Sequence, residues 1–169
     1  MQKVKTYLWF EKDAEAAMNF YVEIFNGAPE KKAESKVVSL SRYPEGPLEG
    51  PMVGLEGKVA NGAFMLAGNE FIAFDGGPQF KFNEAISLFV DCDTQKEVDY
   101  YWEKLSAVPE AEACGWLKDK FGLSWQIVPK ALGQLMSDPD AEKAGRVMQA
   151  MLQMKKLDIA QLQAAHDDK

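Results

Sequence analysis

The chain contains two copies of one pattern, separated by fixed offsets. Residues 19–25 (NFYVEIF) resemble residues 99–105 (DYYWEKL), which lie 80 positions later, and the same offset aligns residues 7–10 with residues 87–90. A second match, between residues 68–74 and 122–128, has an offset of 54. The difference between the two offsets places 26 extra residues in the middle of the first copy. Because repeated units bury their apolar faces against each other, we expect a site in the cleft that two copied sheets would form.

Each copy has the pattern of a strand, a helix and further strands. The elements predicted for the first copy are a strand at 4–10, a helix at 13–26, a strand at 37–40 and a hairpin of 63–66 and 70–74. Those predicted for the second copy are a strand at 85–90, a helix at 94–107 and strands at 114–117 and 124–128. Strands that follow a helix without further alternation favour an α+β fold.

Capping residues mark the ends of the two predicted helices. Asp13 and Thr94 are the expected N-caps, and Glu97 completes a capping box with Thr94. Gly27 is expected to end the first helix in the left-handed conformation. Between the helix and the hairpin of the first copy, the loop at 43–62 is rich in proline and glycine and supplies the extra length.

The last 40 residues have no counterpart in the first copy. A helix is predicted to start at 137–140, with Pro139 in its first turn. Its apolar face is predicted to contain Ala144, Val147, Met148, Met151 and Leu152. A shorter final helix would contain Ile159 and Leu162. We expect this tail to cover a sheet face or to form a dimer seam; a methionine-rich binding surface is the alternative.

Composition excludes several classes of function. The formal charge is −7 and the chain has no cluster of Lys and Arg, which argues against a nucleic-acid partner. No run of about 18 apolar residues is present, so we expect no membrane span. The first residues are not typical of a signal peptide. We therefore expect a cytoplasmic protein in which Cys92 and Cys114 are reduced.

Several motifs resemble a known family. They are residues 75–78 (DGGP), 80–87 (FKFNEAIS), 114–119 (CGWLKD) and 121–129 (FGLSWQIVP), continuing at 146–148 and 151–156. These segments resemble the vicinal oxygen chelate superfamily, the glyoxalase and bleomycin-resistance fold. Within it they are most similar to the PhnB-like group, also labelled 3-demethylubiquinone-9 3-methyltransferase-like. The resemblance covers most of residues 3–160.

The resemblance implies two βαβββ modules that form a glyoxalase-like half-barrel, plus C-terminal helices. We expect paired modules in residues 1–130, with module one at 3–75 and module two at 84–129, and a helical extension at 131–169. Superfamily relatives are commonly dimers, and the sheet edges of an open half-barrel need covering. We therefore also expect a homodimer.

Metal enzymes of this superfamily place their ligands on the first and last strand of each module. Aligned by the repeat, those positions are Tyr7, Ile72, Ser87 and Gln126. None of them is His, Asp or Glu, and a neutral amide with two hydroxyls compensates a divalent cation poorly. The single histidine, His166, is expected to be a solvated residue of the tail. We predict no metal site and no Ser-His-Asp or Cys-His chemistry.

The methyltransferase label implies a glycine-rich turn that approaches a methyl donor. Gly76-Gly77 is the only adjacent glycine pair, and Pro78 removes one free N–H group from the turn. We therefore interpret 75–78 as an ordinary turn and predict no cofactor. The thiol of Cys92 is flanked by Asp91 and Asp93, whose charges raise its pKa, so it is a poor nucleophile.

The remaining candidate site is an aromatic pocket with a few polar groups. Alternation along strands sends about half of the strand aromatics, Phe89 included, to the concave face. The candidate ligand-binding residues are Tyr7, Trp9, Phe74, Phe82, Asn83, Ser87, Trp116, Trp125 and Gln126. Buried amides and hydroxyls need hydrogen-bond partners, and a ligand could supply them.

Three hypotheses follow from these residues. The first is a metal-independent protein that binds an unknown small molecule, with sequestration as one way of acting. The second is an uncharacterised enzyme of the glyoxalase/dioxygenase superfamily with non-standard catalytic groups, which a pocket-facing carboxylate such as Glu70 or Asp119 would favour. The third is a structural or interaction module.

Overall fold

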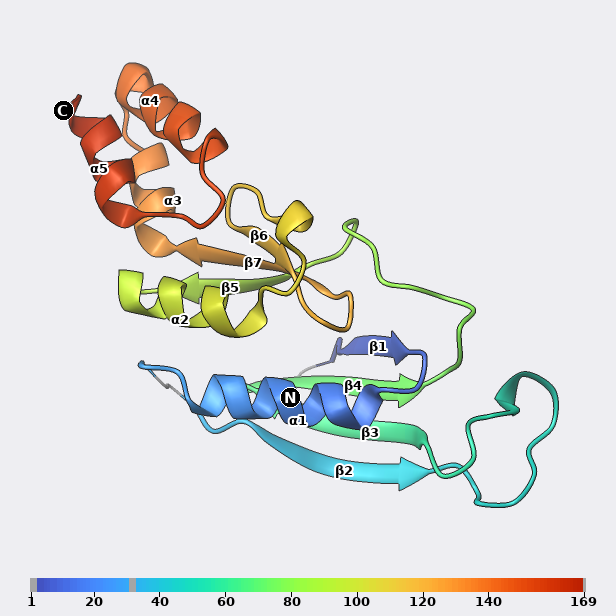
Figure 1. Cartoon of the computed structure of the whole chain (residues 1–169). Helices are drawn as coiled ribbons and strands as arrows, with labels where there is room; N and C mark the ends of the chain where they lie inside the picture. The colour runs from blue at the N-terminus through green and yellow to red at the C-terminus, as the bar shows by residue number, and fades with distance from the viewer. Residues whose placement is uncertain (1–2, 31–32, 169) are drawn as a thin grey trace. The chain divides into compact units, whose positions relative to one another are not determined.

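The computed structural model describes residues 3–30 and 33–168, and the chain divides into two compact units after Phe82 (Figure 1). The elements of the first unit are β1 (Thr6–Phe10), α1 (Ala14–Asn26), β2 (Lys36–Arg42), β3 (Val59–Leu66) and β4 (Asn69–Asp75). The strands form one sheet in the order β1-β4-β3-β2, in which β1 is parallel to β4 and the other pairs are antiparallel. This is a βαβββ module, as the sequence pattern predicts.

Helix α1 packs on one face of this sheet, against β2, β3 and β4. Its buried face contains Met18 and Tyr21, and Leu8 and Phe10 of β1 are also buried. Asp13 occupies the N-cap position, but its side chain makes no capping hydrogen bond. The N–H of Ala14 is bonded instead by Oδ1 of Asp75, at 2.8 Å, a partner that local sequence could not indicate.

The end of α1 differs from the prediction. Gly27 has φ −84° and ψ −3°, a right-handed conformation, so the expected left-handed cap was wrong. The side chain of Asn26 ties the chain back, because it donates to the carbonyl oxygen of Ser35 and accepts from the N–H of Ser35. The turn at Ala67-Gly68 is confirmed, and both residues have positive φ, as a two-residue hairpin turn of the primed type requires.

The elements of the second unit are β5 (Leu88–Cys92), α2 (Gln95–Leu105), β6 (Trp116–Lys118), β7 (Ser124–Pro129), α3 (Lys130–Met136), α4 (Ala141–Leu152) and α5 (Ile159–Asp167). The strand order is β5-β7-β6, with β5 parallel to β7. Within the described residues this sheet has three strands, and a short 3₁₀ helix at Pro109–Ala111 stands where the module's second strand was expected. The protein is thus a mixed α+β fold with two small sheets and C-terminal helices.

The predicted N-cap of α2, Thr94, is confirmed, whereas the return bond of the predicted capping box goes to a different residue. The hydroxyl of Thr94 accepts from the N–H of Glu97, at 3.3 Å. The carboxylate of Glu97 returns to accept from the N–H of Asp93, at 2.6 Å, one residue before the usual partner. Two backbone donors at the start of the helix are therefore satisfied.

The predicted strand at 114–117 starts later, at Trp116. Cys114 and Gly115 have φ of 50° and 86° and form a tight turn between Ala113 and Trp116. The N–H groups of Cys114 and Gly115 donate to the carbonyl oxygens of Met154 and Lys155, both at 2.8 Å. Hydrogen bonds to the connection between α4 and α5 therefore hold this turn in place.

The C-terminal helices pack on one another and enclose a small core (Figure 1). That core consists of Leu132, Val147, Leu157 and Leu162. Helix α3 was not predicted, and α4 begins after Pro139 rather than with Pro139 in its first turn. On α4, Val147 faces this core whereas Met148 and Leu152 are exposed, so only part of the predicted apolar face is buried. No helix of the described residues is long and apolar enough to cross a bilayer.

The elements that the two modules share are equivalent, but not at a single offset. Tyr21 and Tyr101 are both buried at the offset of 80, and Gly68 and Gly122 occupy matching turns at 54. In the strands, Tyr7 is the partner of Ile72, whereas Phe89 is the partner of Gln126. With β4 and β7 aligned at 54, β1 and β5 therefore align at 82, and the equivalent of Tyr7 is Phe89 rather than Ser87.

Candidate functional site

The face of the first sheet opposite α1 carries a row of aromatic side chains. Alternation along β1 buries Leu8 and Phe10 on the helix side and places Tyr7 and Trp9 on the other face. Phe74 of β4 lies beside Trp9 as its strand partner. Three of the predicted pocket residues therefore share one open face because of strand period and register alone.

These rings touch one another in tilted and edge-to-face arrangements. The ring centroid of Phe74 is 5.0 Å from that of Tyr7 and 4.7 Å from that of Trp9. Phe80, which the sequence analysis did not select, extends the row at 4.9 Å from Trp9. Tyr7 is 53% exposed and Phe80 is 65% exposed, so both ends of the row offer aromatic surface. Phe80 follows β4 in an irregular segment, where strand periodicity gives no signal.

Backbone contacts hold Trp9 in place. Its indole Nε1 donates to the carbonyl oxygen of Gly77, at 2.9 Å. Beneath the ring lies Gly76, which is buried. The N–H groups of Gly76 and Gly77 donate to the carbonyl oxygens of Phe10 and Glu11, at 2.8 and 3.0 Å. Phe82, another predicted pocket residue, contacts Phe10 instead, with ring centroids 5.2 Å apart.

In the second unit the predicted residues separate onto two faces. Gln126 of β7 donates from Nε2 to the hydroxyl of Ser87, at 2.9 Å, and Trp116 is the strand partner of Gln126. Trp125 points the other way: it is buried, and its Nε1 donates to Oδ2 of Asp119, at 2.8 Å. Asn83 is exposed and accepts from the N–H of Ala85 in a local turn. Ser87, Trp116 and Gln126 therefore lie together, whereas Trp125 belongs to the core.

The two carboxylates that would favour an enzyme both have structural partners. Asp119 is buried and accepts from the N–H groups of Phe121 and Leu123 as well as from Trp125. Glu70 forms an ion pair with Lys5, with 2.7 Å between Nζ and Oε1. Asp119 shapes the turn before β7, and Glu70 joins β4 to the residue before β1.

The donor set does not fit a divalent metal. By strand pairing, the mapped ligand positions are Tyr7 and Ile72 in one unit and Phe89 and Gln126 in the other. These side chains offer a phenol and an amide, and the amide nitrogen already donates to Ser87. Within the described part of the chain, no three His, Cys, Asp or Glu side chains are grouped so as to hold a metal ion. A divalent cation needs anionic or imidazole ligands that these positions lack.

The glycine pair does not fit a methyl-donor site either. A cofactor-binding turn presents free N–H groups to its ligand. Here the N–H groups of Gly76 and Gly77 already donate to the carbonyl oxygens of Phe10, the last residue of β1, and of Glu11. The pair continues the β1–β4 pairing and leaves room for Trp9, which accounts for both glycines without a cofactor.

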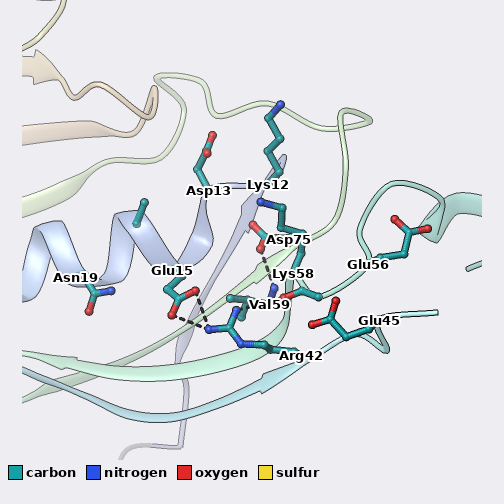
Figure 2. Close-up of a pocket in the computed structure, with 12 residues that line it drawn as sticks. Lys12, Asp13, Glu15, Asn19, Arg42, Glu45, Glu56, Lys58, Val59 and Asp75 are labelled. Carbon is teal, nitrogen blue, oxygen red and sulfur yellow. Dashed lines mark hydrogen bonds and ion pairs between the residues drawn. The ribbon is translucent and has the colours of Figure 1, made fainter. Parts of the chain in front are cut away.

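A hollow of about 530 Å³ lies at the start of α1 (Figure 2). One wall is the base of the loop between β2 and β3, the segment that lengthens the first copy. Its charged lining residues are Lys12, Asp13, Glu15, Arg42, Glu45, Glu56, Lys58 and Asp75. Sequence reasoning missed this hollow, because its charged groups are spread over four segments and form no motif.

Four of these eight charged side chains have structural partners: Glu15, Arg42, Glu56 and Asp75. Nη2 of Arg42 donates to both oxygens of Glu15, at 2.7 and 2.8 Å. Asp75 is 1% exposed, and its oxygens accept from the N–H groups of Ala14 and Val59. Burial raises the pKa of Asp75 more than these hydrogen bonds lower it. The pKa of Glu56 is lowered because its carboxylate accepts from loop N–H groups, its own and that of Gly54 first. These contacts connect the loop, the helix and the sheet, so the role of the paired groups is structural.

Comparison with known proteins decides the family. The model of the 3-demethylubiquinone-9 3-methyltransferase family matches residues 2–128. The chain belongs to this family. The PhnB protein of Bacillus cereus is 39% identical, and the match covers 76% of this chain and 99% of that one, with a TM-score of 0.59. The matched family segment ends within β7, so α3, α4 and α5 lie outside it.

A more distant structure supports the fold alone. Protein PA1353 from Pseudomonas aeruginosa is 16% identical over 76% of this chain and 98% of that one, with a TM-score of 0.56. No curated protein matches the sequence. Fold and family are therefore shown, and activity has to be argued from the site.

Proposed function

We propose that this PhnB-like protein binds a small, flat, partly aromatic organic molecule on the open face of its first sheet, without a metal ion. The observation that carries this proposal is the row of Tyr7, Phe74, Trp9 and Phe80. The centroids of neighbouring rings in this row are 4.7 to 5.0 Å apart. The partly exposed ends of the row let a ligand ring join in the same offset or edge-to-face contacts. Apolar ligand sites have this composition, with few polar groups to orient the ligand.

Polar groups border the aromatic row on the same sheet face. The hydroxyl of Tyr7 lies 3.4 Å from Oδ1 of Asn61 on β3. The hydroxyl of Ser41 on β2 donates to the backbone carbonyl oxygen of Asn61, at 3.2 Å. A ligand that carries an oxygen substituent on its ring would find donors and acceptors here.

The family description names methyl transfer to a demethylubiquinone, and a quinone-type ring suits the aromatic row. Methyl transfer itself finds no support in this chain, because Gly76 and Gly77 have their N–H groups engaged. An enzyme that uses Glu70 or Asp119 as acid or base finds no support either, because each holds structural partners. Binding therefore remains the function that the site favours.

The test combines ligand discovery with a defined probe. Native mass spectrometry of freshly purified protein should show a copurifying organic molecule. Menadione, a quinone with no tail, should bind and quench tryptophan fluorescence, and Trp9→Ala or Tyr7→Ala should weaken binding at least tenfold. Phe20→Ala, on α1 at the other side of the sheet, is the matched aromatic control. Equal affinity in all four proteins, or none in the wild type together with no copurifying ligand, would favour the interaction-module hypothesis.

We also propose that the protein is a cytoplasmic homodimer. Met148 and Leu152 give α4 an exposed apolar strip that a second copy could cover. Cys92 and Cys114 are free thiols, which suits a reducing compartment. Sedimentation at micromolar concentration should give about twice 18.9 kDa, and a purely monomeric species would contradict the dimer.

A further inference from the structure

His166, the single histidine of the chain, is held between two carboxylates. Its Nε2 lies 2.9 Å from Oδ2 of Asp138, in the connection between α3 and α4. Its Nδ1 lies 3.0 Å from Oδ1 of Asp167, at the end of α5. The His166 side chain is only 13% exposed, so the expectation of a solvated tail residue was wrong.

This arrangement requires a charged ring. A neutral imidazole has one N–H donor, whereas two carboxylates offer only acceptors, so both contacts are satisfied only by the imidazolium form. The pKa of His166 is raised accordingly, first by Asp167 and then by Asp138. The pKa of Asp138 is lowered, first by the N–H of Asp140 and then by the hydrogen bond from His166. Asp138 is therefore ionised wherever the ring titrates.

Other charged and polar groups surround the ring. On α4, Lys143 lowers the pKa of Asp138, and Arg146 donates to the carbonyl oxygens of Ala165 and His166, at 2.9 and 2.8 Å. On α5, Gln163 donates to Oδ1 of Asp167. The ordinary pKa values of Lys and Arg lie far above neutral pH and that of Asp far below it, whereas that of His lies near 6.5. The ring of His166 is therefore the group of this cluster that changes charge near neutral pH.

The start of α5 is fixed by contacts that do not titrate. The side chain of Gln95 on α2 accepts from the N–H of Ile159, at 2.8 Å, and donates to the carbonyl oxygen of Leu157, at 3.1 Å. Leu162 of α5 is fully buried in the core of the C-terminal helices. The first turn of α5 is thus held by neutral hydrogen bonds and apolar packing, and its last turn by the hydrogen bonds from Arg146 together with the charge-dependent contacts of the His166 ring.

We propose that Asp138, His166 and Asp167 form a pH-sensitive clasp on the C-terminal half of α5. The clasp holds that half firmly against the α3–α4 connection while the ring is protonated and loosens it when the ring is neutral, so that only the hydrogen bonds from Arg146 remain there and Gln95 keeps the first turn anchored. This inference is independent of the proposed ligand.

The direction of the pH effect follows from the raised pKa of His166. A group whose pKa is higher in the folded state stabilises that state fully below its ordinary value of about 6.5 and loses this contribution as the pH rises through the folded value. A His166 pKa that is one unit higher in the folded state than its ordinary value corresponds to about a tenfold change in the equilibrium constant for opening. Above the folded value, a neutral ring turns a lone pair toward one carboxylate, which favours release.

The first test is a proton NMR titration of tag-free protein, in which one histidine gives one set of ring signals. The midpoint should lie above 6.5, and Asp138→Asn and Asp167→Asn should each lower it. A midpoint at or below 6.5 in the wild type would overturn the clasp, and this measurement needs no variant to fold.

The second test is residue-resolved amide exchange, corrected for the intrinsic base-catalysed rate. Protection at 163–167 should fall between pH 6 and pH 9, whereas protection at 159–162 should stay constant. In His166→Gln, which cannot titrate, protection at 163–167 should be low at both values. The same pH dependence in wild type and His166→Gln would overturn the proposal.

Discussion

Gly76 lies directly beneath the indole ring of Trp9. An ideal Cβ on Gly76 would be 2.8 Å from Cδ2 of Trp9 and closer still to Cε2 and Cζ2. The same indole donates to the carbonyl oxygen of the next residue, Gly77. The first glycine of the motif at 75–78 therefore makes room for the aromatic row, and the second supplies an acceptor that fixes its central ring.

We expect Gly76→Ala to displace Trp9. The added methyl group has no space, so the ring must move away from Gly77 and Phe74, at a cost of about 1–3 kcal/mol in the free energy of unfolding. Denaturant unfolding measures that cost, and the emission maximum of tryptophan should shift. Gly145→Ala is the control, since nothing lies within 4 Å of its Cβ position in α4, and it should stabilise by about 0.5–1 kcal/mol. Equal effects of the two substitutions would contradict the packing argument.

We expect divalent metals to leave the protein's stability unchanged. The mapped ligand positions offer no carboxylate or imidazole, so specific binding has no basis. A metal at 100 times its dissociation constant would add about 2.7 kcal/mol. Melting curves with EDTA, zinc, nickel or magnesium should therefore coincide. A rise in the melting temperature that Gln126→Ala abolishes would revive the metalloenzyme hypothesis.

The repeat shows how far the sequence alone can go. Module order, helices α1 and α2 and the hairpin turn at Gly68 follow from spacing, because apolar periodicity and turn residues act locally. The alignment of β1 with β5 was two residues off. A slip of two keeps every side chain on its face, so either alignment gives the same alternation of buried and exposed residues. Only the pairing of Phe89 with Gln126 reveals it.

Long-range partners account for the other differences. No local signal identifies Asp75 rather than Asp13 as the cap of α1, because Asp75 lies 61 residues from Ala14, whose N–H donates to it. Trp125 and Trp116 are both aromatic strand residues, and only the buried carboxylate of Asp119 shows which one belongs to the core. The boundary predicted at 130/131 stays a prediction.

We expect Asp75→Asn to destabilise the first unit far more than Asp13→Asn. Both oxygens of Asp75 accept backbone N–H groups, and an amide replaces one acceptor with a donor, which leaves a buried N–H unpaired. The expected loss is about 1–3 kcal/mol. Asp13 makes no capping hydrogen bond, so its substitution should stay within about 0.5 kcal/mol. The reverse order in chemical denaturation would show that Asp13 is the true cap.

The stability of wild type should also fall as the Asp75 carboxyl ionises. Burial raises the pKa of Asp75, so the unfolded chain loses this proton at lower pH than the folded one. Stability therefore decreases with rising pH from the ordinary value of about 3.9 up to the folded value. The difference in unfolding free energy between wild type and Asp75→Asn should shrink across that window. A difference that grows with pH would mean that the hydrogen bonds outweigh burial.

We expect the two thiols to react at very different rates. Cys92 is fully buried, and burial first, then Glu97, Asp91 and Asp93, raises its pKa to about 12, so almost no thiolate forms at pH 8. Cys114 is partly exposed in its left-handed turn. Ellman's reagent should therefore label one thiol in the native protein and both in denaturant. Cys114→Asn, which tolerates a positive φ, should remove the native reaction. Labelling of Cys92 at a comparable rate in folded protein would show that β5 opens readily and that its thiol is not sealed in the core.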